Sequence, residues 1–106
     1  MTCFADALAA LQLTCIRTRL EQTPQGNCLW VWLDRPQAYN AISMELLTEL
    51  HRLLDLCAHL LSLLSPLPPD FPRVLVLGGS GRAFSGGVDI KAAKAGVGGA
   101  GVPVDI

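Results

Sequence analysis

Side chains are small in the segment Arg82–Lys91, which reads RAFSGGVDIK and follows the apolar run Val74–Leu77. Ser85–Gly87 have small side chains or none, so that we expect the N–H groups of the main chain to be accessible to a bound molecule. Backbone N–H groups of this kind stabilise a carbonyl oxygen that gains negative charge during a reaction. A helix that begins at Asp89 would add the positive end of its dipole beside the same place. The segment therefore fits an oxyanion hole.

Three other interpretations of these glycines compete with an oxyanion hole. A dinucleotide fingerprint, G-x-G-x-x-G, counted from Gly79 and Gly81 needs a third glycine where Phe84 stands. A phosphate-binding P-loop counted from Gly81 to Gly86 needs a lysine and a hydroxyl residue where Gly87–Val88 stands. The third interpretation is a tight turn from a strand to a helix, which glycines also serve. The spacing by itself leaves this turn open as an explanation.

The composition limits the classes of protein that the chain resembles. A length of 106 residues fits one small domain, in which 51% of the residues are hydrophobic and 16% are charged. Because so short a chain buries only a moderate share of its surface, we expect burial against a partner or membership of a larger unit. The formal net charge of −1 gives no electrostatic case for binding nucleic acid.

Metal, disulfide and membrane functions find no support in the sequence. The four cysteines form no C-x-x-C pair and no zinc-ligand cluster with histidine, so we expect reduced, buried thiols. His51 and His59 stand eight positions apart on one predicted helix, too far around it to share a metal ion. The apolar stretch Leu53–Leu64 is shorter than the roughly 20 residues of a membrane span. The N-terminus, with an early Asp6 and no basic residues before it, does not resemble a signal peptide.

Two strands and a helix are predicted before the glycine-rich segment. Leu13–Glu21 alternates and contains β-branched residues, which favours a strand. Cys28–Asp34 is apolar on both faces and is predicted to be a strand buried on both, joined to the first as a hairpin by a loop of about five residues. From Met44 apolar residues recur at helical spacing, with Ser43 as N-cap, and the prolines that follow end the helix by Ser65.

A third strand completes the predicted α/β fold. Arg73–Gly79 reads as a buried strand, followed by the glycine loop and a short helical stretch over Ile90–Lys94. The long helix is a crossover between strands, which predicts parallel pairing with a right-handed connection. Residues 1–12 are predicted to be a lead that forms a short helix or frays, and residues 95–106 a poorly ordered tail.

Two ordered motifs resemble the enoyl-CoA hydratase/isomerase (crotonase) superfamily. They are LDRPQAYNAIS before the helix and RVLVLGGSGRAFSGGVDIK after it, and the resemblance covers roughly residues 13–94. It implies a partial crotonase-like ββα superhelix: strand hairpin, crossover helix, buried strand, glycine loop and helix start. The R-A-F-x-x-G-x-D-I-K form looks most like the 3-hydroxyisobutyryl-CoA hydrolase branch, although hydratases have nearly the same motif.

The resemblance also implies a role for individual residues. The backbone N–H of Val88 would be the first oxyanion donor, with coenzyme A thioester as substrate and no further cofactor or metal. The RPQAYN loop would border the adenine end of coenzyme A, and AFSGGVDIK would line the thioester and pantetheine. The residues that the resemblance places against coenzyme A are Gln37, Ala38, Tyr39, Ala83, Gly86, Gly87, Asp89, Ile90 and Lys91. Asn40 is expected to tie down its loop, and Asp89 to cap a helix rather than act as an acid or base.

The chain also departs from the family pattern. Val88 stands where we expect alanine, glycine or methionine, and its branch crowds the carbonyl. Family members are well over twice this length, and neither the second glycine-rich donor segment nor the catalytic acids are found here. We therefore expect an N-terminal piece of such a protein, inactive by itself, so that the sequence leaves open whether the chain is an enzyme.

Three functions follow as expectations from the resemblance. The first is hydrolysis of an acyl-CoA thioester of the 3-hydroxyisobutyryl-CoA type, in valine catabolism. The second is an enoyl-CoA hydratase or isomerase of fatty-acid oxidation, and the third is a non-catalytic fragment that binds coenzyme A or another protein. The expected partners are an acyl-CoA and, in the full-length form, copies of the same chain in a trimer. The family leads us to expect a mitochondrial or peroxisomal location, although no clear targeting signal is present.

Overall fold

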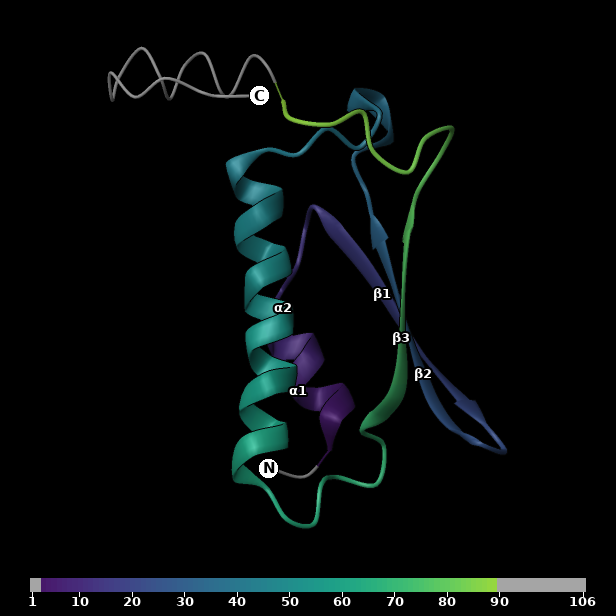
Figure 1. Cartoon of the computed structure of the whole chain (residues 1–106), viewed down its shortest axis with the longest axis vertical. Helices are drawn as coiled ribbons and strands as arrows, with labels where there is room; N and C mark the ends of the chain where they lie inside the picture. The colour runs from purple at the N-terminus through teal and green to yellow at the C-terminus, as the bar shows by residue number, and fades with distance from the viewer. Residues whose placement is uncertain (1–2, 90–106) are drawn as a thin grey trace.

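A computed structural model describes residues 3–89 of the chain. Two helices lie beside a three-stranded sheet, and the longer helix runs along the whole of it (Figure 1). The elements are α1 (Phe4–Ala10), β1 (Ile16–Thr23), β2 (Gly26–Leu33), a short 3-10 helix (Pro36–Ala38), α2 (Met44–Leu63) and β3 (Pro72–Gly79). The predicted helix start over Ile90–Lys94 and the predicted tail over 95–106 lie outside the described residues.

The sheet has the strand order β1-β2-β3 and is mixed. β1 and β2 pair antiparallel, whereas β2 and β3 pair parallel, with Leu33 opposite Gly79. A parallel pair requires a long crossover, and α2 supplies it. The predicted α/β fold, with a hairpin, a crossover helix and a parallel third strand, is therefore confirmed.

The hairpin is tighter than the sequence predicts. Thr23 pairs directly with Gly26, so that only Pro24 and Gln25 form the loop, instead of about five residues. Polar residues at the end of β1 continue the ladder because a two-residue loop matches the twist of the strands better than a longer one. β1 also begins later than predicted, at Ile16 rather than Leu13.

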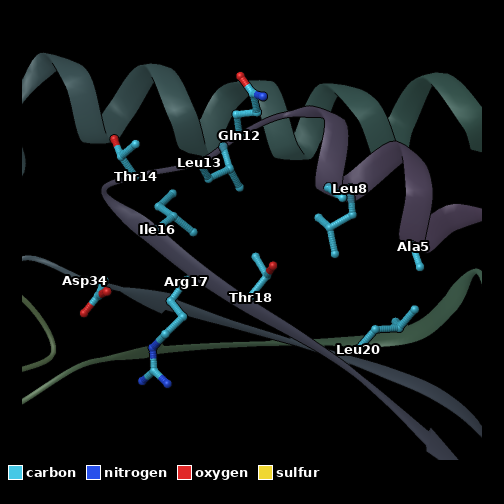
Figure 2. Close-up of a pocket in the computed structure, with 11 residues that line it drawn as sticks. Ala5, Leu8, Gln12, Leu13, Thr14, Ile16, Arg17, Thr18, Leu20 and Asp34 are labelled. Atoms are coloured by element: carbon cyan, nitrogen blue, oxygen red, sulfur yellow. The ribbon is translucent and has the colours of Figure 1, made fainter.

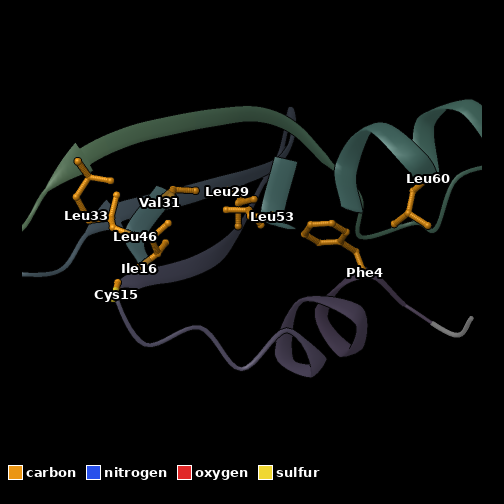
Figure 3. Packing of buried hydrophobic residues seen from close by; sticks show 9 residues of the cluster. All are labelled: Phe4, Cys15, Ile16, Leu29, Val31, Leu33, Leu46, Leu53 and Leu60. Atoms are coloured by element: carbon orange, nitrogen blue, oxygen red, sulfur yellow. The ribbon is translucent and has the colours of Figure 1, made fainter. Parts of the chain in front are cut away.

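α2 forms as the sequence predicts and packs on one face of the sheet. The Ser43 side chain caps it by accepting a hydrogen bond of 3.2 Å from the Leu46 N–H, and the helix ends at Leu63, before the prolines. Buried apolar residues of α1, α2, β1 and β2, together with Cys15 just before β1, meet in a single cluster (Figure 3). Its members are Phe4, Cys15, Ile16, Leu29, Val31, Leu33, Leu46, Leu53 and Leu60. The cluster joins one face of β2 to the buried side of α2.

The predicted burial of two strands is wrong. Only one face of β2 is buried, and on the other face Trp30 and Trp32 are half-buried and stacked with ring centroids 6.0 Å apart. The Arg17 guanidinium carbon lies 4.4 Å from the centroid of the Trp32 ring, in a cation–π contact. β3 was predicted to be buried, yet Val74 is 55% exposed and Leu75 40%. β3 is an edge strand of the described sheet, so that no further strand shields its apolar residues.

The N-terminal lead is a short helix fixed by Asp70. The Asp70 carboxylate accepts hydrogen bonds from the N–H groups of Phe4, at 2.7 Å, and Ala5, at 2.9 Å. Burial opposes the charge, but these bonds outweigh it and lower the pKa of Asp70. The Phe4 ring also meets the edge of Phe71 at 5.3 Å, so that α1 is held by both charge and packing.

The structure gives no sign of a membrane span or of disulfides in its described part. Across residues 3–89 no helix has the length and apolarity to cross a bilayer. The same part of the chain contains no group of three or more residues able to hold a metal ion. All four cysteines are free, and Cys15 is buried while the other three are partly so.

Candidate functional site

The glycine loop, residues 80–89, folds back over the end of β3. A side chain on Gly79 would place its Cβ atom 2.5 Å from the Phe84 carbonyl oxygen and 2.6 Å from the Ala83 carbonyl oxygen. Only glycine therefore fits at this position. Gly81 has a φ of +83°, which glycine adopts without strain. These two glycines explain why the turn after the strand is built from so little side chain.

Asn40 joins the glycine loop to the loop that precedes α2. Its side chain is fully buried, and its Oδ1 atom accepts a hydrogen bond of 2.8 Å from the Arg35 N–H. Its Nδ2 group donates to the carbonyl oxygens of Ser80 and Ala83, each at 2.8 Å. The backbone of Asn40 has a φ of +54°, a left-handed conformation that asparagine tolerates better than most residues. Asn40 therefore ties down its own loop, as expected, and holds the glycine loop as well.

Two amides of the glycine loop are used in bonds within the protein. The Gly86 N–H donates to the Tyr39 carbonyl oxygen at 2.7 Å. The Gly87 N–H donates to the Ser85 hydroxyl at 3.0 Å, and that hydroxyl donates to the Asn40 carbonyl oxygen at 2.9 Å. Gly87 has a φ of +92°, and a Cβ atom there would meet no other atom within 4 Å. Because the space beside Gly87 is open, a side chain would fit there, and glycine is needed only for the positive φ.

Val88 is paired with Ile42 in a parallel bridge, and the geometry of this bridge determines where its amide points. The Ile42 N–H donates to the Gly87 carbonyl oxygen at 2.7 Å, and the Asp89 N–H donates to the Ile42 carbonyl oxygen at 2.9 Å. Successive N–H groups of an extended chain point in opposite directions, so that the Val88 N–H faces away from Ile42. Of the amides of residues 86–89, that of Val88 is the one without an acceptor among the described residues.

Arg35 and Asp89 form an ion pair at the edge of this arrangement. The Arg35 Nη1 atom lies 3.3 Å from the Asp89 Oδ2 atom, and both side chains are mostly shielded from solvent. The same nitrogen donates to the Ala41 carbonyl oxygen at 2.7 Å. This pair links the residue after Val88 to the loop before α2, which is a second restraint on the direction of the Val88 amide.

The structure brings most of the predicted site residues to one place. Tyr39, Ala83, Gly86, Gly87, Val88 and Asp89 lie on the two joined loops. Gln37 and Ala38 belong to the short 3-10 helix of the first loop. Ile90 and Lys91 were predicted to contact coenzyme A and lie outside the described residues. That any of these residues contacts coenzyme A stays a prediction.

Three residues that position the loop are not evident as site residues in the sequence. Arg35, Ile42 and the hydroxyl of Ser85 make the contacts described above, and none of these contacts has a pattern in the sequence. Arg35 precedes a proline in the first motif, which marks the end of a strand but not its ion pair. Ser85 was considered only for its small size.

Glu49, Cys15 and Cys57 have shifted pKa values and lie outside the two joined loops. Burial opposes the charge of Glu49, but bonds from Thr14 and Cys15 outweigh it and lower the pKa of this carboxylate. Burial raises the pKa of the Cys15 and Cys57 thiols, which therefore stay protonated at neutral pH. In the described part of the chain, the joined loops offer a backbone donor as their reactive feature.

A cavity of about 550 Å³ lies elsewhere, between α1 and β1 (Figure 2). Its walls are mixed, with apolar residues such as Leu8 and Ile16 beside polar ones such as Thr18. Figure 2 shows Gln12 and Asp34 on opposite sides of it. None of its lining residues belongs to the glycine loop.

Solved structures share the fold of this chain. No family model matches the sequence. A Pseudomonas aeruginosa protein is 36% identical, with a TM-score of 0.60, over 82% of this chain and 31% of its own. An enoyl-CoA hydratase/isomerase from Mycobacterium paratuberculosis is 26% identical, with a TM-score of 0.56, over 74% of this chain and 26% of its own. An enoyl-CoA hydratase from Shewanella pealeana, at 21% identity and a TM-score of 0.63, supports the fold over 82% of this chain and 29% of its own. The chain thus spans less than a third of the length of these proteins.

Proposed function

We propose that this chain, whose solved structural neighbours support a place in the crotonase (enoyl-CoA hydratase/isomerase) superfamily, is part of a protein that processes acyl-CoA thioesters. The observation that carries the proposal is the Val88 amide. Its neighbours on both sides are bonded within the protein, while its own N–H has no acceptor among residues 3–89. The Val88 side chain is 43% exposed, so that this part of the chain is open to a ligand.

The chemistry proposed for Val88 is polarisation of a thioester carbonyl. A donor fixed before the reaction needs no reorganisation when negative charge develops on the oxygen. Loss of one such donor typically costs about 3 kcal/mol of transition-state stabilisation. The site also lies beyond the carboxyl ends of the parallel strands β2 and β3, where ligands of open α/β sheets commonly bind. The substrate is the coenzyme A thioester, and we propose no further cofactor.

The finer reaction is proposed from the loop motif. The motif RAFSGGVDIK favours thioester hydrolysis of the 3-hydroxyisobutyryl-CoA type. Hydration or isomerisation of an enoyl-CoA fits the same amide equally well. All of these reactions place negative charge on the thioester oxygen and therefore use the same donor. They differ in the acids and bases that act on substrate or water.

The proposal is tested by titrating the ¹⁵N-labelled chain with acetyl-CoA and, separately, with free coenzyme A. Both ligands share the nucleotide and the pantetheine, but only acetyl-CoA has the carbonyl. We expect the Val88 amide proton signal to move downfield with acetyl-CoA and to stay in place with coenzyme A. If the two titrations perturb residues 86–89 equally, or leave them unchanged, the proposed function is wrong.

A pair of variants separates the amide from the side chain. Val88→Pro removes the N–H, and because this N–H makes no bond within the described residues, we expect the Ile42 bridge to keep both of its hydrogen bonds. Val88→Ala keeps the N–H and removes the branch. We expect V88P to bind acetyl-CoA no more tightly than coenzyme A, whereas V88A keeps the preference for the thioester.

A second candidate function is interaction with another protein chain. It is favoured by the exposed apolar edge of β3 and by Leu61 and Leu63 on α2, which are 59% and 64% exposed. Such an edge is a ready template for pairing with another strand. Sedimentation velocity over a range of concentrations tests it, with a monomer at all concentrations as the result against it. Assembly with copies of the same chain, including a trimer, belongs to the same proposal.

A further inference from the structure

We infer that the Ser85 hydroxyl is a positioning group that restricts the glycine loop to one available amide, that of Val88. This inference rests on the proposed function, because it concerns which donor meets the thioester oxygen. It is carried by a pair of hydrogen bonds that converge on one oxygen atom. Ser85 itself touches no reacting atom and acts through Gly87.

The Ser85 hydroxyl is used as donor and as acceptor at the same time. It donates to the Asn40 carbonyl oxygen at 2.9 Å and accepts from the Gly87 N–H at 3.0 Å. A hydroxyl has one hydrogen to donate, so the first bond fixes its orientation and leaves its lone pairs for Gly87. The Asn40 side chain is buried, and both its oxygen and its nitrogen are hydrogen-bonded. The backbone carbonyl of Asn40 is therefore a rigid anchor for the Ser85 hydroxyl.

The occupied Gly87 amide matters because it is the nearest competitor of the Val88 amide. Two successive N–H groups beside a left-handed residue form a concave anion site. Gly87 has a φ of +92° and open space beside it, which would allow its amide to join such a site. With the Gly87 N–H held by Ser85, a carbonyl oxygen meets a single donor in a single direction. Without the hydroxyl, the oxygen can be shared between two amides or shifted toward Gly87.

Ser85 also restrains the peptide on which the direction of the Val88 amide depends. The bond to Gly87 and the bond from Ile42 to the Gly87 carbonyl oxygen hold this glycine on both sides. Glycine has the widest choice of backbone conformations, so that a glycine held at one side only would sample several. The role of Ser85 is thus to make a flexible residue present one fixed geometry.

The test uses a matched pair, Ser85→Thr and Ser85→Val, which have the same shape and differ by the hydroxyl. Amide hydrogen exchange is measured by NMR on the ¹⁵N-labelled chain without ligand. We expect Gly87 to exchange about fivefold faster or more in S85V than in S85T or the native chain, as loss of one hydrogen bond predicts. Ser62→Ala is the control, because Ser62 donates a comparable bond of 3.1 Å to the His59 carbonyl oxygen on α2. It should leave Gly87 unchanged.

The second measurement is the titration with acetyl-CoA. In the native chain and S85T we expect the Val88 amide to respond, and in S85V we expect the response to be divided between Gly87 and Val88. A merely structural role for Ser85 would weaken binding without moving the response to Gly87. Equal Gly87 exchange in S85T and S85V, or a response confined to Val88 in S85V, overturns the inference. A native chain that does not respond to acetyl-CoA refutes the proposed function, while the exchange rates still decide whether Ser85 holds Gly87.

Discussion

Replacing Asn40 is the most informative perturbation of the two joined loops. Asn40→Ala removes one acceptor and two donors from a fully buried position, so that the Arg35 N–H and the carbonyl oxygens of Ser80 and Ala83 lose their bonds. Each lost bond costs about 1 kcal/mol. The left-handed backbone at φ +54° adds about 1 kcal/mol for alanine. We therefore expect N40A to lose about 4 kcal/mol of unfolding free energy, the sum of these two costs.

Guanidinium unfolding, followed by circular dichroism of α2, measures this loss. Asn40→Gly makes the same bonds impossible but adopts the left-handed backbone freely, so it should retain about 1 kcal/mol more than N40A. Asn27→Ala is the matched control, because the Asn27 side chain makes one bond of 2.9 Å, to the Asp70 carbonyl oxygen. It should lose about 1 kcal/mol. An N40A variant within about 1 kcal/mol of the native chain would refute the reasoning, because the bonds would then not hold the loops.

Four further outcomes are expected. Because bonding lowers the pKa of Asp70 from its ordinary 3.8, the stability that its charge adds is present above that pH and lost as the pH falls through the lower, folded value. An NMR titration of the Phe4 amide should show this loss in the native chain and not in Asp70→Asn. In thermal melts, Gly79→Ala should destabilise the chain by about 1–3 kcal/mol, because the new Cβ atom clashes with backbone. Gly87→Ala should cost about 1–2 kcal/mol, because alanine is strained at the positive φ. Val74→Lys should reduce concentration-dependent association in sedimentation, because a charge on an exposed edge strand opposes pairing.

The fold follows from the sequence where local pattern and chain connectivity decide it. The helical spacing and Ser43 predict α2 correctly, and a helix between two strands predicts their parallel pairing. The hairpin loop was predicted too long, because polar residues at a strand end still pair when the turn allows it. Burial of β3 was wrong because apolar composition shows what a strand can bury and not what covers it. The exposed Val74 is an example.

The candidate site is predictable only in part. Small residues at Ser85–Gly87 mark a loop that exposes main chain, and the match of this loop to a family motif identifies Val88. The contacts that orient the Val88 amide come from Ile42 and Arg35, which are more than 40 positions away in the chain. Contacts between two loops depend on where the strands place them, and no local period in the sequence encodes that placement.

The register of β2 and β3 explains why these two loops meet. Leu33, the last residue of β2, pairs with Gly79, the last residue of β3, so that both loops leave the same edge of the sheet at the same level. The Ser80 N–H then donates to the Leu33 carbonyl oxygen at 2.9 Å and extends the ladder into the glycine loop. A slip of one residue would reverse the faces of β3 and turn the glycine loop away from Asn40. The direction of a single amide at Val88 is thus set by strand pairing that is completed nine residues earlier, at Gly79.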